Sequence, residues 1–551
     1  MKMTKRIFSL ALCLVLMLAL ALPAMAAGET YTLTINNATD GHTYEAYQIF
    51  TGTLTEDKTD PENPRQILSD IKWGSSVNGA ELLAAVKAES GLSNLHPASD
   101  AASLAVLLSA VTSDSATIDL FAEVVGAHLT AVAGTSTDAG EHYTISGLAA
   151  GYYLVKDKDN SLADTAHDVY TKYIIRVLKN ETVTPKGDVP KVDKTINDTI
   201  DGTFTDVEDF DINDTAYYKW EGTLPSNLKS YDSYYYKFID TLPTGLDFLS
   251  FEQVYLEGHD GDVVHKFFDK TVNTEMPEDI NANVSGKNVT LEFEDLLTLY
   301  PNILPTQKIV VKYTARVTRD ALIADPMTNS VKVEFSNNPN GDGDGDHGTT
   351  PEDVAHAFTF QINVDKYDAD KTDKKLEGAE FVLYYERTEG GAIVKHYAKV
   401  ITEEMIAAGG EINGLPVDAD DLGVVYGWTD DITQASVLDT DANGSLNVRG
   451  LDEGIYYLKE TKAPAGYNLM ETPVQIKIVP TYTASGDEMS VTVSYEVDSI
   501  AQSSNTVGVR NSSGSTLPVT GGAGTTMFYV VGGLLVAAAA IMLISKRRVE
   551  E

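Results

Sequence analysis

Short runs in which apolar and polar residues alternate dominate the chain from about residue 30 to residue 510. Tyrosine, valine, isoleucine and threonine are enriched in these runs, and glycine, asparagine and aspartate separate them. Alternation with a period of two predicts half-buried β-strands, and many short strands divided by turn residues are typical of β-sandwiches. Examples are residues 31–35, 152–155, 173–178, 234–239, 289–293, 309–313, 331–335, 381–385 and 474–479.

One region has a different period. From Ala80 to Leu129 the apolar residues recur at every third or fourth position, which predicts helices that bury one face. We interpret these stripes as core packing of a helical insertion in the first domain rather than as a binding groove. They comprise Leu82, Leu83 and Val86, then Leu104, Leu107, Leu108 and Val111, then Ile118, Phe121, Val125 and Leu129.

Two segments rich in turn residues mark domain boundaries, residues 184–191 and 337–353. A weak internal repeat between residues 147–157 and 450–460 indicates that the first and third domains are related sandwiches. We therefore predict an all-β chain of three tandem Ig-like β-sandwich domains, the first with the helical insertion. The predicted segments are 1–26, 27–186, 187–356, 357–513 and 514–551.

The first segment has the features of a cleaved secretory signal peptide. Lys2, Lys5 and Arg6 precede an apolar run, and Ala24-Met25-Ala26 supplies a cleavage site after residue 26. An uncleaved N-terminal anchor helix is the alternative. The only cysteine, Cys13, leaves with the peptide, so the secreted chain has no disulfide bond.

The last segment combines three features in a fixed order. Leu517-Pro518-Val519-Thr520-Gly521 comes first, the apolar stretch Met527–Ile544 follows, and Lys546-Arg547-Arg548 ends it. The stretch is just long enough for a transmembrane helix with the basic residues on the cytoplasmic side. A plain membrane anchor would explain the stretch alone. The whole arrangement resembles the cell-wall sorting signal of Gram-positive bacteria, in which a sortase cleaves at the Thr520–Gly521 bond.

Charge excludes several classes of partner. Among 551 residues, 81 are acidic and 41 basic, for a net charge of −40. Nucleic acids and anionic membrane surfaces both need clustered lysine and arginine, so neither is an expected partner. A secreted chain without cysteine must also gain its resistance to unfolding from something other than disulfides.

Polar residues end several apolar stripes in the last two predicted domains. Residues two apart in a strand share a face, so these side chains point into the core. Burial of an unpaired charge is costly, so each set of three should meet inside its domain. The sets are Lys194, Asp240 and Asn329 in the middle domain and Lys366, Glu460 and Asn511 in the third.

The chemistry of such a set follows from its burial. In an apolar core a lysine loses its charge more easily and an acid holds its proton more tightly. A neutral amine can attack the side-chain carbonyl carbon of asparagine, expel ammonia and leave a Lys–Asn isopeptide bond. On the pattern alone, the alternative stays open that each lysine lies at a strand end and extends to water.

Several segments resemble backbone pilins of Gram-positive bacteria, of the SpaA/FimA type. Residues 460–467 are similar to the E-box of these pilins, and together with residues 376–381 they resemble a collagen-adhesin B-type domain. Residues 239–246 and 329–339 resemble the middle pilin domain, and residues 41–50 resemble the first. The resemblance implies the isopeptide bonds Lys194–Asn329 and Lys366–Asn511, promoted by Asp240 and Glu460.

The first domain departs from that pattern. Its first strand carries no lysine, so no bond of the usual form is expected there, although Asp157 occupies the place of the acid. A reversed pair of Asn37 with Lys179 is conceivable, because Lys179 shares a face with Ile175 and Val177.

The family places its polymerising lysine after a valine-rich strand and a proline. Val183-Thr184-Pro185-Lys186 occupies that position, although the usual tyrosine before proline is threonine and the upstream tryptophan is missing. Lys191 is the competitor. We favour Lys186 because it ends the first-domain strand, whereas Lys191 leads into the next one. Lys186 as an ordinary solvated linker lysine is the alternative.

The resemblance implies a structural protein, the major subunit of a fimbria anchored to the cell wall. Its partners would be other copies of itself, a class C pilin sortase, a housekeeping sortase, tip and base minor pilins and peptidoglycan, with host glycans or matrix proteins as further ligands. A monomeric anchored adhesin is the main alternative, and a surface enzyme is a weaker one.

No turnover site and no cofactor are expected. The glycines of residues 343–348 fit a dinucleotide fingerprint by letters only, because aspartates surround them and no helix follows. The acidic loop 341–347 could offer oxygen ligands to calcium, but it lacks the terminal glutamate of an EF-hand, and we favour a plain surface loop. No histidine pair has metal-binding spacing, so we predict no metal site.

Overall fold

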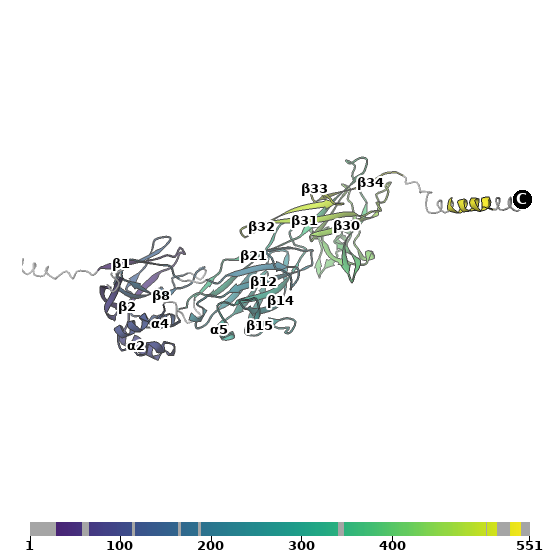
Figure 1. Ribbon diagram of the computed structural model, residues 1–551. Helices are drawn as coiled ribbons and strands as arrows, with labels where there is room; N and C mark the ends of the chain where they lie inside the picture. Colours follow the sequence, from purple (N-terminus) through teal and green to yellow (C-terminus); the bar gives the residue numbers. More distant parts are fainter. Residues whose placement is uncertain are drawn as a thin grey trace, which may run out of the picture. The chain divides into compact units, whose positions relative to one another are not determined.

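The computed structural model describes residues 29–57, 65–112, 116–162, 167–185, 189–339, 346–502, 504–514 and 529–541. The predicted signal peptide, Lys186 and the pentapeptide 517–521 lie outside these ranges. The chain divides into two compact units. The first comprises Met1–Glu208, Thr215–Arg316 and Met327–Ala357, and the second Asp209–Asp214, Val317–Pro326 and Phe358–Glu551. Strands and helices of both units are labelled in Figure 1.

The first unit begins with a sandwich of two sheets, with strand orders β5-β6-β1-β9 and β3-β2-β7-β8, where β4 also pairs with β2. The strands are β1 (Thr30–Ile35), β2 (Tyr44–Asp57), β3 (Arg65–Trp73), β4 (Gly134–Thr135), β5 (Thr137–Asp138), β6 (Tyr143–Ala149), β7 (Gly151–Asp157), β8 (Lys172–Val177) and β9 (Glu181–Val183).

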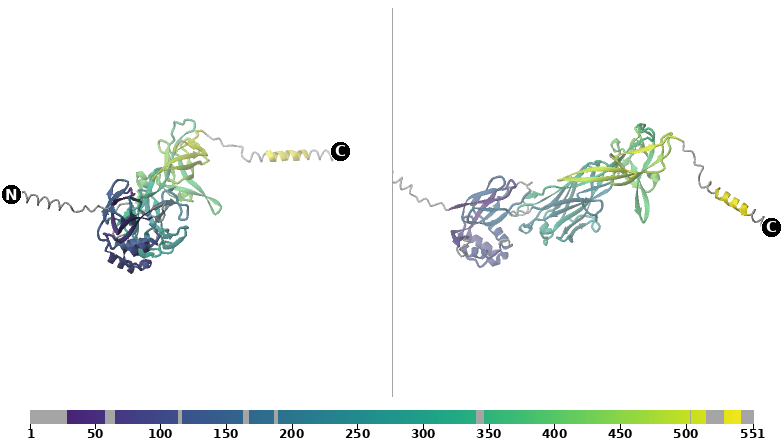
Figure 2. Two further views of the ribbon diagram at one scale, coloured as in Figure 1. Left: turned by 60° about the vertical axis from the view of Figure 1, so that its left-hand side comes forward. Right: turned by 45° about the horizontal axis from the view of Figure 1, so that its top comes forward.

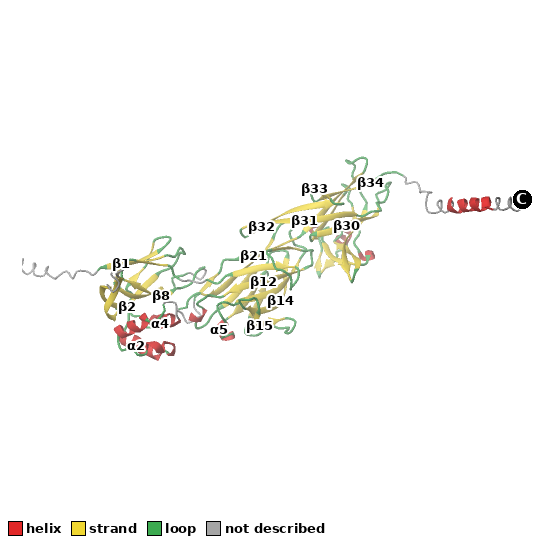
Figure 3. Cartoon of the chain, in the orientation of Figure 1, coloured by secondary structure: helices red, strands yellow, loops and turns green. Residues whose placement is uncertain are grey.

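The predicted helical insertion is confirmed. It consists of α2 (Gly79–Ala88), the 3-10 helix η1 (Ser90–Leu95), α3 (Ala101–Ser109) and α4 (Ala116–Gly126). These helices gather on one side of the sandwich (Figures 2 and 3). Apart from Ile118, their predicted stripes pack into a core with Tyr47, Ile49, Phe50 and Leu154 of the adjoining sheet. The stripes therefore fill a core rather than line a groove, as expected.

The middle sandwich has the strand orders β10-β12-β18-β14-β15 and β11-β21-β19-β13-β17-β16, where β20 pairs with β19. The elements are β10 (Val192–Asn197), β11 (Val207–Asp209), β12 (Thr215–Thr223), η2 (Leu228–Ser230), β13 (Tyr236–Thr241), β14 (Leu246–Glu257), β15 (Val263–Asp269), β16 (Asn281–Ser285), β17 (Asn288–Phe293), α5 (Leu296–Leu299), β18 (Lys308–Val317), β19 (Met327–Ser336), β20 (His347–Thr349) and β21 (Asp353–Phe358).

The third sandwich has the strand orders β29-β22-β34 and β27-β24-β23-β30-β31-β32-β33, where β28 pairs with β23. The elements are β22 (Phe360–Asp368), β23 (Glu380–Glu389), β24 (Ala392–Val400), α6 (Glu403–Ala407), β25 (Glu411–Ile412), β26 (Leu415–Pro416), η3 (Ala419–Asp421), β27 (Val425–Thr429), η4 (Ile432–Gln434), β28 (Leu438–Asp439), β29 (Ser445–Leu451), β30 (Gly454–Lys462), β31 (Val474–Ser485), β32 (Glu488–Val497), β33 (Ile500–Gln502) and β34 (Thr506–Asn511).

The all-β prediction with three successive sandwiches is thus confirmed, and period-two alternation explains it. In β12, for example, Ala216, Tyr218 and Trp220 are buried while the residues between them are only half-buried. The expected strand 234–239 is shifted by two residues, since β13 spans Tyr236–Thr241. The exact domain boundaries remain a prediction.

The predicted transmembrane segment is corrected. The apolar stretch Met527–Ile544 is helical over residues 529–541. The described part of this helix spans about 20 Å at 1.5 Å per residue, against about 30 Å for the hydrocarbon core of a bilayer. Within the residues that the structure describes, no helix is long and apolar enough to cross a membrane.

Candidate cross-linking sites

The three predicted residues of the middle sandwich meet in its core. Lys194 comes from β10 in one sheet, and Asp240 and Asn329 come from the neighbouring strands β13 and β19 in the other. Asp240 lies opposite Val331, so Asn329 stands two residues further along the same face of β19. All three side chains are fully buried. The lysine therefore does not extend to water, and the set bridges the two sheets.

Tyr313 of β18 joins the members of this set. Lys194 Nζ donates to Asp240 Oδ2, and the Tyr313 hydroxyl donates to the same oxygen at 2.9 Å. The Tyr313 oxygen also accepts from Lys194 Nζ at 3.2 Å and from Asn329 Nδ2 at 2.7 Å. Trp220 Nε1 adds a further donor to Asp240 Oδ2 at 2.8 Å. One hydroxyl thus uses its hydrogen and both lone pairs on the three predicted residues.

The electrostatics of this core favour proton sharing between lysine and acid. Burial lowers the pKa of Lys194 to about 8, although Asp240 opposes the shift. Burial raises the pKa of Asp240 against the opposing effect of Lys194 and the hydrogen bonds it accepts. The rings of Tyr218, Trp220 and Tyr313 surround Nζ at 5.1, 5.7 and 5.5 Å. The Lys194 amine therefore becomes neutral far more readily here than in water.

The predicted residues of the third sandwich also meet. Lys366 lies on β22, Glu460 on β30 and Asn511 on β34, which runs parallel to β22. Lys366 Nζ contacts Asn511 Oδ1 and lies 3.0 Å from Glu460 Oε1. Burial lowers the pKa of Lys366, and Glu460 opposes that shift. All three residues are buried, so the Lys366 side chain does not extend to water either.

The acid of the third sandwich reaches the amide directly. Asn511 Nδ2 donates to Glu460 Oε2 at 2.9 Å and to the Asn468 carbonyl oxygen at 2.7 Å. The Met470 amide N–H donates to the same Glu460 oxygen at 2.7 Å. Each set therefore presents an amine, an amide and an acid in one dry pocket, which is the constellation that acyl transfer from asparagine to lysine requires.

The first sandwich buries its acid with a different partner. Asp157 ends β7, accepts from the Thr171 amide at 2.7 Å, and lies 2.7 Å from His42 Nδ1. His42 Nε2 lies 3.1 Å from Asp168 Oδ2. Burial opposes a charge on His42, but the hydrogen bonds to Asp157 and Asp168 outweigh it and raise its pKa to about 9. A histidine thus neutralises the acid that a lysine would otherwise meet.

The reversed pair is not brought together. Lys179 is exposed, and the Asn37 amide donates to the Tyr44 hydroxyl at 2.9 Å and to Asp168 at 3.3 Å. The sequence reasoning missed His42, although His42, Tyr44 and Ala46 share one buried face and so gave a signal. It also missed Tyr313, which shares a buried face with Val311 and Ala315.

Lys191, the competing polymerising residue, lies at the start of the middle sandwich. Its side chain is exposed, and its backbone pairs with Thr223 through hydrogen bonds of 2.8 Å. It leads directly into β10, as expected. The favoured residue, Lys186, lies outside the described ranges.

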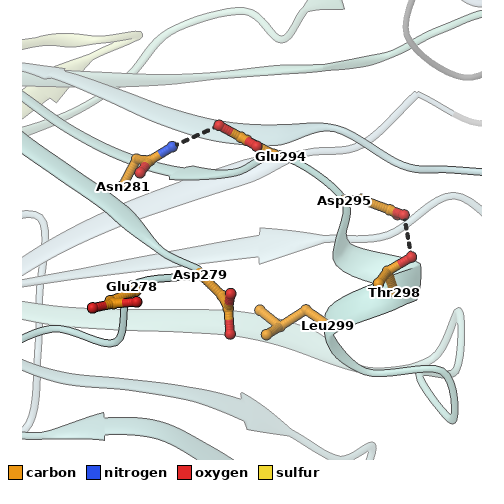
Figure 4. Close-up of a pocket in the computed structure, with 7 residues that line it drawn as sticks. All are labelled: Glu278, Asp279, Asn281, Glu294, Asp295, Thr298 and Leu299. Carbon is orange, nitrogen blue, oxygen red and sulfur yellow. Dashed lines mark hydrogen bonds between the residues drawn. The ribbon is translucent and has the colours of Figure 1, made fainter.

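An acidic hollow of about 410 Å³ lies beside α5 (Figure 4). Four of its polar groups bond in pairs: Asn281 donates to Glu294 at 3.1 Å, and the Thr298 hydroxyl donates to Asp295. Most of the acidic loop 341–347 lies outside the described ranges. In the described part of the chain, no group of three or more histidines, cysteines and acids could hold a metal ion.

Comparisons with known families address the two C-terminal segments. Residues 510–551 match the LPXTG cell wall anchor motif. The chain carries a cell-wall anchor. This match confirms the predicted sorting signal and the cell-wall localisation in a Gram-positive bacterium. Residues 360–493 match SpaA, a prealbumin-like fold domain, so the resemblance found in the third domain is confirmed as well.

The solved structures that this chain matches share little sequence identity with it. The T6 backbone pilin of Streptococcus pyogenes is 17% identical, with 89% of this chain and 99% of that chain covered and a TM-score of 0.47. For the major pilins SpaD and SpaA of Corynebacterium diphtheriae, identities are 16% and 13% and the TM-score is 0.41. These cover 88% of this chain and 98% and 100% of theirs. A comparison with curated proteins finds no match.

Proposed function

We propose that this chain is the shaft subunit of a sortase-assembled pilus. The observation that carries the proposal is the pair of buried lysine–acid–asparagine sets in a chain with a cell-wall anchor and a SpaA-type domain. A fibre under tension gains from covalent links that no reductant breaks, and these sets would supply them inside each subunit in place of disulfides.

Each internal link would form once, without turnover. The neutral lysine Nζ attacks the asparagine Cγ, the new C–N bond forms, and the bond to Nδ2 breaks as ammonia leaves. Asp240 or Glu460 takes the proton from the amine and supplies one to the leaving group. The chain loses one ammonia, about 17 Da, for each bond.

Links between subunits would use the sorting signal. A sortase cysteine attacks the Thr520 carbonyl carbon, releases the segment that begins with Gly521, and holds Thr520 as a thioester. Lys186 of another copy attacks the thioester and joins C-terminus to side chain. A class C pilin sortase would repeat this step, and a housekeeping sortase would pass the base of the fibre to peptidoglycan. Tip and base minor pilins would complete the fibre.

Immunoblots of the cell-wall fraction test the external links. A shaft subunit gives a ladder of high-mass species, and Lys186→Ala abolishes it while Lys191→Ala leaves it intact. A single band from the unmodified chain would contradict polymerisation and favour a monomeric anchored adhesin. A ladder that depends on Lys191 instead would retain the shaft and reassign the lysine.

A further inference from the structure

The two candidate sets differ in how the acid reaches the leaving group. Glu460 Oε2 accepts directly from Asn511 Nδ2 at 2.9 Å. Aspartate is one methylene shorter, and Asp240 meets Asn329 through the Tyr313 hydroxyl, with separations of 2.9 Å and 2.7 Å. The hydroxyl therefore occupies the place that the extra methylene of glutamate fills in the third sandwich.

We propose that Tyr313 is a catalytic residue of isopeptide formation in the middle sandwich, where its hydroxyl relays a proton from Asp240 to the departing nitrogen of Asn329. This inference rests on the proposed internal bond. Tyr313 qualifies because its oxygen touches both reacting nitrogens, Lys194 Nζ and Asn329 Nδ2. The Trp220 indole N–H donates only to the acid, so it holds Asp240 in place and cannot relay a proton.

The proton relay leaves Tyr313 and Asp240 in their starting protonation states. Attack of the Lys194 amine on Asn329 Cγ moves the carbonyl electron pair to Oδ1 and turns Nδ2 into a basic amine. Once Asp240 is protonated and Nδ2 carries a free lone pair, both hydrogen bonds of the Tyr313 hydroxyl reverse. Asp240 then gives its proton to the Tyr313 oxygen while Tyr313 gives its own to Nδ2. The Cγ–Nδ2 bond breaks, ammonia leaves, and the carbonyl re-forms. The surplus proton on Nζ returns to Asp240, so tyrosine and acid end as they began.

The geometry also orients the amide. The carboxamide of asparagine can be rotated by half a turn, and a donor or acceptor beside it decides which end faces the acid. Because Tyr313 accepts from Nδ2, the nitrogen that must leave faces the proton source. The hydroxyl is enclosed by the stacked ring of Tyr218 and by Trp220, with ring centroids 5.2 and 4.9 Å from that of Tyr313. Water cannot readily replace it.

The test measures the rate of bond formation in the full chain, by pulse-labelled expression and intact mass spectrometry. Proteolytic fragments assign each loss of about 17 Da to a sandwich. We expect Tyr313→Phe to slow the middle bond by about 100-fold or more, the usual contribution of a positioned proton donor. The bond of the third sandwich forms normally in the same molecules and serves as an internal control.

Two further variants separate relay from packing. Tyr236→Phe removes another buried hydroxyl of this core, one that donates to the Thr223 carbonyl oxygen at 3.1 Å, and should leave the rate unchanged. Asp240→Glu in the Tyr313→Phe background restores the missing reach and should recover the bond. Equal slowing by Tyr236→Phe, or a double variant no faster than Tyr313→Phe, would overturn the proposal.

The outcomes also separate this inference from the proposed function. An unmodified chain that keeps its full mass would refute the internal bonds altogether. An unmodified chain that loses both ammonias, with Tyr313→Phe equally fast, would refute only the relay.

Discussion

The first and third sandwiches have the same strand arrangement but secure it by different chemistry. In the first, β1 lies between β6 and β9, and β7 lies between β2 and β8. In the third, β22 lies between β29 and β34, and β30 lies between β23 and β31. The internal repeat places Asp157 where the third sandwich has Glu460. The same buried acid thus occurs in two related frameworks.

Strand register shows which residues take the other places. Leu33 faces Ile145 in the first sandwich as Ile362 faces Val448 in the third, so Asn37 stands where Lys366 would be. Ile35 pairs with Val183 as Val364 pairs with Val507. An asparagine therefore replaces the lysine of the usual bond in the described part of the first sandwich.

His42 supplies the missing cation. Its ring stacks on Tyr44 with centroids 5.2 Å apart, and Lys366 Nζ lies 5.2 Å from the centroid of Phe381. Tyr44 pairs with Asp157 as Phe381 pairs with Glu460, so the two aromatic rings are equivalent. The comparison indicates that each sandwich pairs its buried acid with a basic side chain, a histidine in the first and a lysine in the third.

Removal of the acid in the third sandwich should have the largest effect. Glu460→Ala leaves Lys366 buried without its acid, and we expect a mass about 17 Da above that calculated for the same variant with its bond formed. The third sandwich should lose about 3–5 kcal/mol from the broken buried pair, besides the lost link. Intact mass and thermal unfolding measure both changes. Exposed Glu471→Ala is the control, and a Glu460→Ala chain of bonded mass would contradict the role of Glu460.

Removal of the cation in the first sandwich should have the next largest effect. His42→Ala leaves the buried Asp157 without its basic partner, and we expect a loss of about 3 kcal/mol with no change in mass beyond the substitution. Thermal unfolding of the purified chain measures it, with exposed His259→Ala as the control. A sandwich that keeps its stability would mean that Thr171 alone satisfies Asp157.

The buried sets were predictable because a polar residue at the end of an apolar stripe interrupts the alternation of its strand. Lys194, Asp240 and Asn329 each do so. Tyr313 does not interrupt the alternation, because a tyrosine fits an apolar face. Only the folded core shows which groups its hydroxyl contacts. His42 escaped for another reason: Asp157 and Asp168 lie more than a hundred residues away, and the fold alone brings them together. The membrane helix was wrong, since among the described residues no helix is long and apolar enough to cross a membrane.

The pH dependence of the first sandwich should sharpen the comparison. The pKa of His42 is raised from 6.5 to about 9, so its stabilisation is fully present below pH 6.5 and is lost as pH rises through about 9. This shift corresponds to about 3 kcal/mol at most. Thermal unfolding of the unmodified chain and of His42→Gln, compared at pH 6.5 and well above pH 9, measures it. A loss of equal size in His42→Gln would assign the effect to other groups.

The smallest expected effect separates the imidazole from its neighbours. The Thr171 hydroxyl donates to Asp157 Oδ2 at 3.0 Å, so Thr171→Val removes one neutral donor and keeps the ionic one. We expect a loss of about 1 kcal/mol in the thermal unfolding of the first sandwich. Thr137→Val, which breaks an exposed hydroxyl pair, should cost less and is the control. In Thr171→Val, Asp157 still has its contact with His42. If this variant nevertheless lost as much stability as His42→Ala, the Thr171 hydroxyl, and not the imidazole, would take the role of the lysine in the third sandwich.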